Sequence, residues 1–378
     1  MPSPRSIGAL TRVRRLGWRR EKNTPVFSLT GCAPAGHITV VAGIGVVLNP
    51  RSRRNLRDPR AEARLAQTLG DHGVVRAARS IDELYRIAED FRRDAIDVLA
   101  ISGGDGTNHV TLTGFLDVYG RATIPQVALL RGGTMNTVAN SVGVSKGRPE
   151  GILGRLIRDY ARRANAPMEN VERHVMRIAP TSGGKAHYGF LFGTGVMCGF
   201  LADYYRDGEP SPLVAAKTLA RGIGSAFIGG PTIRRMAEPF RGSVSLSCRP
   251  RDEHPLHGGD RREEDWGERD YLAVAAGTIA HIGLNFKPFY RYRERPGHFH
   301  MLGIHASPVG FVRELPRIHR GEPMRPDKAF DALAERAVVR RPAEDGGRLR
   351  YMIDGDLHES DGDLEVTIGP KVTLVVVR

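Results

Sequence analysis

The chain has 378 residues, enough for two domains that each bury a core, and its 56 Lys and Arg against 42 Asp and Glu give a formal net charge of +14. A basic surface attracts polyanions, but no zinc-finger, homeodomain or RNA-binding aromatic signature occurs, so we expect a nucleotide or an anionic membrane and no nucleic acid. Three cysteines without a C-x-x-C pair exclude a disulfide framework and a structural zinc site. The sequence contains no run of about 18 apolar residues, so we expect no transmembrane helix.

The first 43 residues are predicted to form a flexible basic leader. Arginines concentrate in its first 25 residues, where they could contact anionic lipid. Residues 29–32, Leu-Thr-Gly-Cys, resemble a lipoprotein cleavage box. The stretch before them, residues 23–28, is too short and too polar for the apolar part of a signal peptide. An upstream start site is the alternative explanation for this segment.

The segment 44–165 shows the alternation of strands and helices that is typical of a parallel sheet covered on both faces. Short apolar runs predict buried strands, and a capping box that begins at Ser80 predicts a helix start. In chain order we predict strands over 44–48, 96–101 and 127–130, and helices over 60–69, 81–91, 107–116 and 135–142. Ligands of such sheets bind at the carboxyl ends of the strands.

The segment 166–378 changes to short strands and predicts a β-rich second domain. The charged stretch 249–270, with little hydrophobicity, predicts a long solvated loop. The predicted strands cover 171–179, 188–192, 242–248, 271–276, 299–304, 337–340, 348–353, 364–368 and 372–377. Helical insertions are predicted over 199–205, 213–228 and 309–319.

Two glycine clusters follow predicted strands at the ligand-binding edge of the sheet. In Gly-Gly-Asp-Gly-Thr, residues 103–107, the glycines let backbone N–H groups approach a phosphate, and Asp105 offers a carboxylate to Mg²⁺ or to a substrate hydroxyl. The second cluster, Gly-Gly-Thr-Met-Asn at 132–136, adds Thr134 and Asn136 as partners for phosphate or ribose. One such cluster alone could be a tight turn with a capping aspartate, but two at adjacent strand ends favour a nucleotide site. No Walker-type G-x-x-x-x-G-K-[ST] sequence is present.

Together with Asn49-Pro50, these clusters resemble the diacylglycerol kinase catalytic domain family, which includes sphingosine and ceramide kinases and bacterial lipid kinases. Two later segments fit the family in the same order: Gly-Phe-x-x-Asp ending at Asp203, and Asp-Gly-Asp at 354–356, where the family usually has D-G-E. The resemblance implies an α/β domain with a parallel sheet and a β-sandwich domain, with the active site in the cleft between them. The last strand is expected to return to the first domain.

The resemblance also implies a chemistry. The γ-phosphate of ATP, with Mg²⁺, would pass to the hydroxyl of diacylglycerol, a sphingoid base or ceramide, as in phospholipid biosynthesis. By position, Asp356 would be the general base, Asp354 would support the metal and phosphate network, Asp105 would lie beside the phosphates, and Asp203 would contact the polar head of the lipid. The expected nucleotide-binding residues are Asn49, Pro50, Gly103, Gly104, Gly106, Thr107, Gly133, Thr134 and Asn136. Mg²⁺ is expected on the ATP phosphates, with its direct protein ligands open.

Several positions depart from the family pattern. Asp356 is one methylene shorter than glutamate, Val110 stands where a glutamate is usual, and Arg131 replaces a common proline. Pro296 replaces the aspartate that helps to hold a structural Mg²⁺ in some bacterial members, so we expect no second metal site. Two alternatives stay open, the first because NAD kinases share the loop at 103–107 and the second because of these departures. One is an NAD kinase-like enzyme, and the other is a non-catalytic lipid- or nucleotide-binding protein on a kinase scaffold.

The stretch 213–228 carries Lys217 and Arg221 among apolar residues. This pattern is typical of an amphipathic helix that contacts a membrane, and ordinary packing against the second domain is the alternative. With the basic charge, it predicts a cytoplasmic protein in peripheral contact with anionic membranes. The sequence leaves a homodimer open.

Overall fold

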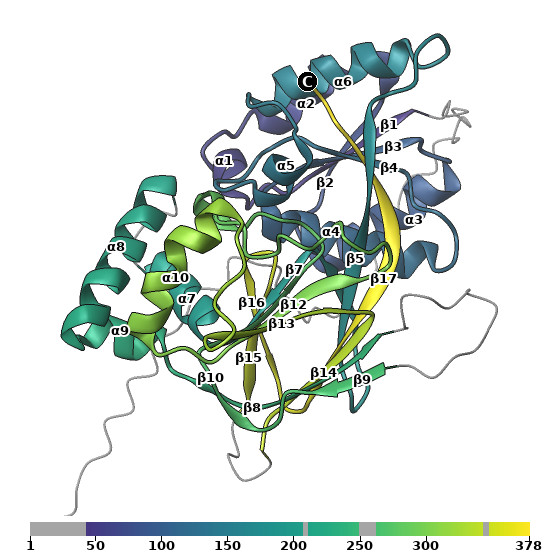
Figure 1. Cartoon of the computed structure of the whole chain (residues 1–378). Coiled ribbons are helices and arrows are strands. Elements are labelled where there is room, and N and C mark those ends of the chain that lie inside the picture. The colour runs from purple at the N-terminus through teal and green to yellow at the C-terminus, as the bar shows by residue number, and fades with distance from the viewer. Residues whose placement is uncertain (1–42, 207–210, 249–261, 343–347) are drawn as a thin grey trace, which may run out of the picture.

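The computed structural model describes residues 43–206, 211–248, 262–342 and 348–378. The expected basic leader, with the Leu-Thr-Gly-Cys segment at 29–32, lies outside the described residues. An α/β domain and a β-rich domain lie side by side, as the fold class predicted, and a long strand near the C-terminus joins them (Figure 1).

The α/β domain is built on a parallel sheet in the order β2-β1-β3-β4. Every residue of β1 and β3 is buried, which explains why both strands are nearly continuous apolar runs that the sequence predicts well. By contrast, β2 lies at the edge of the sheet, is only partly buried and was not predicted. The strands are β1 Ile44–Leu48, β2 Gly73–Ala77, β3 Val98–Ser102 and β4 Gln126–Leu129.

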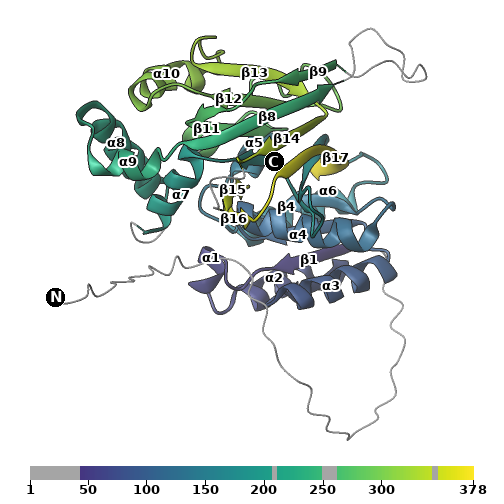
Figure 2. The same cartoon turned by 90° about the horizontal axis from the view of Figure 1, so that it is seen from below.

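Helices cover both faces of this sheet (Figure 2). The helix α3 begins at the predicted cap, where the hydroxyl of Ser80 accepts a hydrogen bond of 3.1 Å from the backbone N–H of Glu83. The long helix α4 is buried along most of its length because it also packs against β6 of the second domain. The helices are α1 Arg53–Leu56, α2 Ala61–Leu69, α3 Ile81–Arg93, α4 Asp105–Tyr119, α5 Thr137–Val142 and α6 Pro149–Ala161, with a 3-10 turn at Gly70–His72.

The β-rich domain contains a six-stranded antiparallel sheet in the order β13-β12-β11-β7-β15-β16. A second sheet, with β10, β8, β14, β17, β5, β6 and β9, packs over it around an apolar core. The strands are β5 Asn170–Pro180, β6 His187–Gly189, β7 Leu191–Gly193, β8 Phe240–Cys248, β9 Arg262–Asp265, β10 Arg269–Tyr271, β11 Ala273–Gly277, β12 Phe299–Ile304, β13 Ala329–Ala334, β14 Arg336–Arg340, β15 Leu349–Ile353, β16 Asp356–Ser360 and β17 Leu364–Val375.

The strand β17 runs through both domains. It pairs antiparallel with β5 and β14, then parallel with β4 through Leu374 opposite Val127. A register shift between Ile368 and Lys371 explains why the sequence predicts two strands here where the structure has one. The sheet of the α/β domain therefore continues without a break into the second domain, which fixes how the two domains meet.

Four helices and a 3-10 turn complete the second domain: α7 Val196–Arg206, α8 Pro212–Ile228, α9 Pro231–Met236, α10 Pro308–Arg320 and the turn Gly283–Asn285. Of the predicted loop over 249–270, residues 249–261 lie outside the described residues, and the prediction is wrong for the remainder, which holds β9 and β10. The side chains of β9 are charged and exposed, and its backbone pairs with β8, so hydrophobicity gave no sign of a strand. In the described part of the chain, no helix combines the length and apolarity needed to cross a bilayer.

Candidate functional site

The two glycine clusters are packed against each other at the carboxyl ends of β3 and β4. A Cβ atom on Gly132 would lie 2.8 Å from the backbone nitrogen of Gly103, and one on Gly104 would lie 3.2 Å from Cα of Gly133. Side chains would therefore force the loops apart. Glycine is needed here because the two backbones approach so closely.

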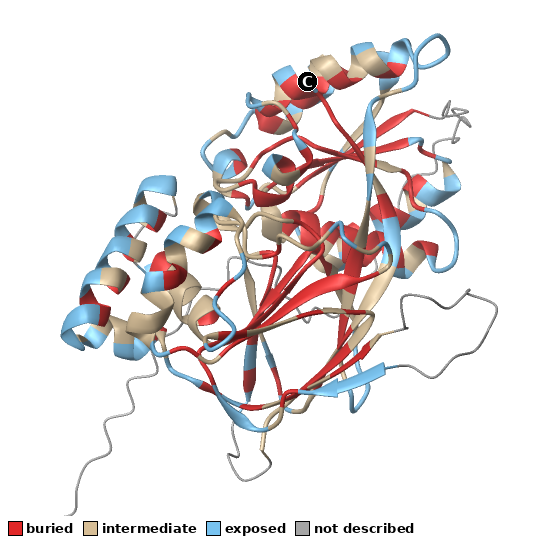
Figure 3. Ribbon diagram, in the orientation of Figure 1, coloured by how far each residue is buried: buried red, intermediate tan, exposed pale blue. Residues whose placement is uncertain are grey.

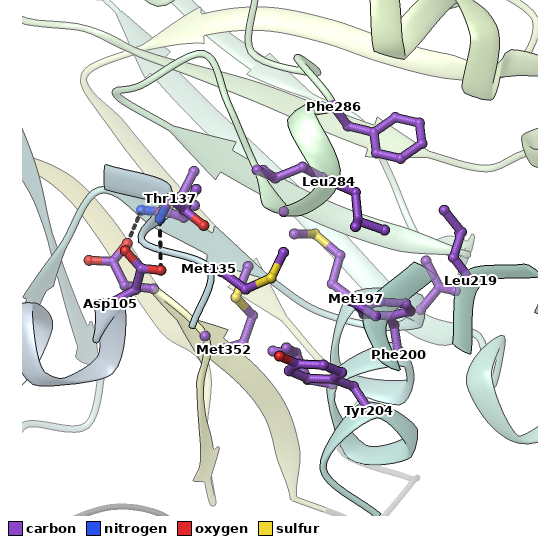
Figure 4. A pocket seen from close by; sticks show the side chains of 18 of the residues that line it. Asp105, Met135, Thr137, Met197, Phe200, Tyr204, Leu219, Leu284, Phe286 and Met352 are labelled. Atoms are coloured by element: carbon purple, nitrogen blue, oxygen red, sulfur yellow. Dashed lines mark hydrogen bonds between the residues drawn. The ribbon is translucent and has the colours of Figure 1, made fainter. Parts of the chain in front are cut away.

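Asp105 holds the second loop to the first. Its Oδ2 accepts from the backbone N–H of Thr137 at 2.8 Å, and its Oδ1 accepts from that of Val138 at 3.1 Å (Figure 4). Burial raises the pKa of Asp105, and these two donors act in the opposite direction. Both oxygens are thus engaged with backbone at the start of α5, so Asp105 serves the shape of the loops.

Other residues of the predicted nucleotide set also shape the loops. The side-chain amide of Asn49 donates to the hydroxyl of Thr107 at 2.9 Å, which ties the end of β1 to α4. Asn136 has a left-handed backbone (φ +48°) and folds back, donating to the carbonyl of Gly133 at 2.9 Å. Arg131, in place of the family's proline, donates to the carbonyl of Val144 at 3.1 Å and braces the same loop from behind.

The Asp-Gly-Asp segment forms the turn between β15 and β16. Asp354 is 2% exposed, and its carboxylate accepts from the backbone N–H groups of Phe190 at 3.1 Å and Leu191 at 2.8 Å. Burial raises its pKa well above the ordinary value despite these bonds. At the turn itself, Gly355 has φ +89°, and its carbonyl accepts from the hydroxyl of Tyr205 at 2.8 Å. Asp354 and Tyr205 therefore fix the turn in place.

Asp356 faces the first glycine loop across the domain boundary. A Cβ atom on Gly106 would lie 2.7 Å from Cγ of Asp356, and both residues line the same cavity. Burial, and secondarily the nearby carboxylate of Asp105, raises the pKa of Asp356 to about 7. Asp356 can therefore exchange a proton near neutral pH, which is the property of a general base.

One cavity of about 1170 Å³ extends from the glycine loops to helices α7, α8 and α10. Its loop end is lined by Asn49, Gly104, Gly106, Thr107, Gly133 and Thr134. The far end is apolar, and Figure 4 shows Met197, Phe200, Leu219, Leu284 and Phe286 there, with Met135 and Met352 between them and Asp105. The cavity thus joins a polar, glycine-rich end to a long apolar end.

Three expected nucleotide-binding residues, Pro50, Gly103 and Asn136, are not part of the cavity wall. Asp203 is also outside the wall. It is 4% exposed and pairs with Arg206 of its own helix and with Arg235 of α9, at 3.6 Å. The structure therefore places Asp203 where it joins α7 to α9, on the side of α7 that does not line the cavity.

Many cavity residues were not found from the sequence, and three of the polar ones are Ser52, Tyr204 and Tyr205. The Ser52 and Tyr204 hydroxyls are buried, with no hydrogen-bond partner among the described residues. Ser52 follows Asn49-Pro50 at a strand end, which is a signal that sequence reasoning could have used. The tyrosines follow Asp203 directly, but only the packing of α7 decides which of the three side chains faces the cavity.

The helix that follows the first glycine loop keeps its place despite the departures from the family pattern. Val110 packs its side chain against the core of the α/β domain. The preceding residue, His109, is buried and bonds through Nδ1 to the carbonyl of Tyr188 at 2.7 Å, which links α4 to the second domain. Where the family's glutamate is missing, the helix is thus held by packing and by the histidine.

A divalent cation fits this site only together with a phosphate ligand. Among the described residues, no group of three or more His, Cys, Asp or Glu side chains could hold a metal ion alone. Asp105, Asp354 and Asp356 all line the cavity. The carboxylates of Asp105 and Asp354 accept from backbone N–H groups, so Asp356 is the most available hard oxygen donor of the three. Mg²⁺ commonly binds through one or two carboxylates plus substrate phosphates, and this donor set suits that mode.

The chain is similar to known proteins in sequence over its first domain and in fold over most of its length. Residues 43–167 match the family model described as "Diacylglycerol kinase catalytic domain". No curated protein matches the chain. A solved structure of a diacylglycerol kinase from Bacillus anthracis str. Sterne is similar over 88% of this chain and 96% of its own, with a TM-score of 0.54 and 12% identity.

Two further structures from the same strain, to which the same name is provisionally given, have TM-scores of 0.57 and 0.56 at 14% and 13% identity. Both also cover 88% of this chain and 96% of their own. At 12–14% identity, these similarities show a shared fold and nothing finer. Residues 43–167 therefore carry the match to the diacylglycerol kinase catalytic domain family, and the chain as a whole has the fold of the solved structures that carry that name.

Proposed function

We propose that this protein is an ATP-dependent lipid kinase that transfers the γ-phosphate to a hydroxyl of diacylglycerol or a related lipid. One observation carries the proposal: Asp356 lies where the first glycine loop meets the apolar part of a single large cavity. A phosphate cradle, a carboxylate with a pKa near 7 and an apolar chamber thus share one space.

The loop end suits a nucleotide triphosphate. The 15-residue helix α4 begins at Asp105 beside this end of the cavity, so the partial positive charge of its N-terminus lies there. Arg51 and Arg53 line the same end and add full positive charges. The buried hydroxyl of Ser52 offers one more donor that the protein itself leaves unused.

The apolar end suits lipid chains. Methionine and aromatic side chains dominate its wall, and methionine adapts easily to ligands of different shape. A dinucleotide such as NAD would leave its polar groups unpaired against these side chains, which argues against the NAD kinase alternative. The acyl chains of a glycerolipid, or the chain of a sphingoid base or ceramide, would bury apolar surface in the same space.

The proposed reaction uses Asp356 as the base. Its carboxylate takes the proton of the lipid hydroxyl while that oxygen bonds to the γ-phosphorus, and the bond to the β-phosphate oxygen breaks to release ADP. When bound, Mg²⁺ would neutralise phosphate charge. In this proposal Asp105 and Asp354 position the loops and the turn, and Asp203 holds α7 in place without touching the lipid.

The proposal is tested by incubating the full chain with radiolabelled ATP, Mg²⁺ and a total lipid extract, and identifying the labelled product by mass. A phosphorylated glycerolipid or sphingolipid supports the proposal, and the Asp356→Asn protein is the control that should bind ATP without transfer. ATP binding without transfer to any lipid would favour a non-catalytic protein. Phosphorylation of NAD would favour the NAD kinase alternative.

A further inference from the structure

The outer face of α8 exposes large apolar side chains. Among the described residues, four large hydrophobic side chains are strongly exposed, and three belong to this helix: Leu213 at 78%, Phe227 at 59% and Ile228 at 83%. Leu213 lies in the first turn of α8, and Phe227 and Ile228 lie in the last. Such exposure at both ends of one helix indicates a surface that meets an apolar partner.

The rest of this face is small or cationic. Between the apolar ends, the exposed residues are Ala216, Lys217, Ala220, Arg221 and Gly224. Neither α8 nor the following helix α9 contains an acidic residue, and α9 adds the exposed Arg234 and Arg235. Long cationic side chains beside exposed apolar ones match the boundary between anionic lipid headgroups and acyl chains.

The inner face of the same helix forms a wall of the cavity. Ala215, Leu219, Gly222 and Ile223 line the apolar end, while the opposite side of α8 is exposed (Figure 3). In Figure 1, α8 and α9 form an edge of the molecule, well away from the sheet of the α/β domain. A surface that met α8 from outside would therefore be separated from the cavity by one helix.

On the basis of the proposed function, we propose that the face formed by α8 and α9 docks on an anionic membrane. Leu213, Phe227 and Ile228 enter the acyl-chain boundary, Lys217 and Arg221 contact the headgroups, and the lipid substrate passes from the membrane into the cavity behind α8. A second protein is a poorer occupant, because stable protein interfaces bury about 800 Å² per partner with 20–30 residues a side, far more than three exposed apolar side chains provide.

Sedimentation with vesicles tests the docking directly. The full chain, the triple variant Leu213→Ser/Phe227→Ser/Ile228→Ser, and the charge variant Lys217→Gln/Arg221→Gln are each mixed with vesicles of phosphatidylcholine alone or with 30% phosphatidylglycerol. The natural chain should bind anionic vesicles at least tenfold more tightly than neutral ones. The triple variant should bind anionic vesicles at least tenfold more weakly than the natural chain. The charge variant should bind anionic and neutral vesicles with nearly the same affinity.

A matched charge control comes from the other domain. Arg158 and Arg162 are exposed at the C-terminal end of α6, so Arg158→Gln/Arg162→Gln changes the net charge equally without touching the proposed face. This control should bind vesicles as the natural chain does. If it weakens binding as much as the α8 charge variant, the attraction is a property of total charge and the proposal is wrong.

Activity measurements then separate docking from catalysis. With 1,2-dioctanoylglycerol as dissolved monomers, the triple variant should keep its rate within twofold, whereas with 1,2-dioleoylglycerol in vesicles it should fall at least tenfold. Equal losses on both substrates would mean that α8 acts through the cavity, which would overturn the docking proposal.

Two further outcomes are distinguishable. If the natural chain phosphorylates neither lipid but the vesicle results hold, the proposed function fails for diacylglycerol and the docking surface stands. If the natural chain is a dimer, the triple variant is a monomer and vesicle binding is unchanged, then the face is a dimer contact and the docking proposal is wrong.

Discussion

Gly106 and Asp356 belong to different domains, yet a Cβ atom on Gly106 would lie 2.7 Å from Cγ of Asp356. The carboxylate therefore occupies the space that a side chain at the first glycine loop would need. The position of Asp356, the proposed base, therefore depends on the absence of a side chain at Gly106, and a substitution at Gly106 tests the proposed mechanism directly.

Replacing Gly106 by alanine should displace the Asp356 carboxylate by about 1 Å. Because misplacement of that size can cost about 10²-fold in rate, kcat for lipid phosphorylation should fall by about two orders of magnitude. The matched control is Gly154→Ala in α6, where an added Cβ meets nothing within 4 Å. That variant should keep full activity and gain up to about 1 kcal/mol in unfolding free energy. Equal activity of the two variants would contradict the proposed geometry.

The activity of the natural protein should depend on the protonation of Asp356. A base must be deprotonated to accept a proton, and burial raises the pKa of Asp356 to about 7. In the free enzyme, kcat/KM should therefore rise about tenfold per pH unit below 7 and reach a plateau above it. Asp356→Asn should lower kcat by about 10²–10⁴-fold at pH 8. A flat profile between pH 5 and 8 would remove Asp356 from this role.

The same group should make the protein less stable at alkaline pH. The folded-state pKa is raised above the unfolded value, so the folded chain binds the proton more tightly, and stability falls as pH rises from about 4 to about 7. Asp356→Asn removes this cost. Its melting temperature should exceed that of the natural chain by a few degrees at pH 8, and calorimetry should find the difference shrinking toward pH 4. A lower melting temperature at pH 8 would show that the carboxylate stabilises the fold.

Several of these features follow from local sequence, and others do not. The strands β1 and β3 and the helix cap at Ser80 were predictable because burial on both faces and hydrogen-bonding side chains leave local patterns. The edge strand β9 was missed because backbone pairing alone holds its charged residues in the sheet. The orientation of Asp203 toward Arg235 was also hidden, since tertiary packing decides which side of α7 faces the cavity.

Tertiary contacts also give the three aspartates of the motifs different roles. Motif position marks Asp105, Asp354 and Asp356 alike, but the backbone N–H groups that engage the first two come from residues far along the chain or in another loop. All three aspartates line the cavity, and only the folded chain shows that the carboxylates of Asp105 and Asp354 are bound to backbone N–H groups.

Replacing each aspartate by asparagine should therefore have different effects: Asp105→Asn should lower stability and ATP affinity, whereas Asp356→Asn should lower kcat. An amide has a single acceptor oxygen, so Asp105→Asn leaves one of the N–H groups of Thr137 and Val138 without its partner. The variant should lose about 1–3 kcal/mol in unfolding free energy and bind ATP at least tenfold more weakly. Calorimetric titration with ATP provides the measurement. Unchanged ATP affinity in Asp105→Asn would show that the second loop keeps its place without this carboxylate.

Two adjacent tyrosines offer a last, internally controlled comparison. The hydroxyl of Tyr205 donates to the carbonyl of Gly355 at 2.8 Å, whereas the buried hydroxyl of Tyr204 has no partner among the described residues. Tyr205→Phe should lower the unfolding free energy by about 1 kcal/mol and slow catalysis, because the turn that carries Asp356 loses a support. Tyr204→Phe removes a buried polar group that makes no bond, so the ligand-free protein should be equally or more stable. Denaturant unfolding of both variants checks the contrast, and a larger loss for Tyr204→Phe would mean that its hydroxyl has a partner in solution.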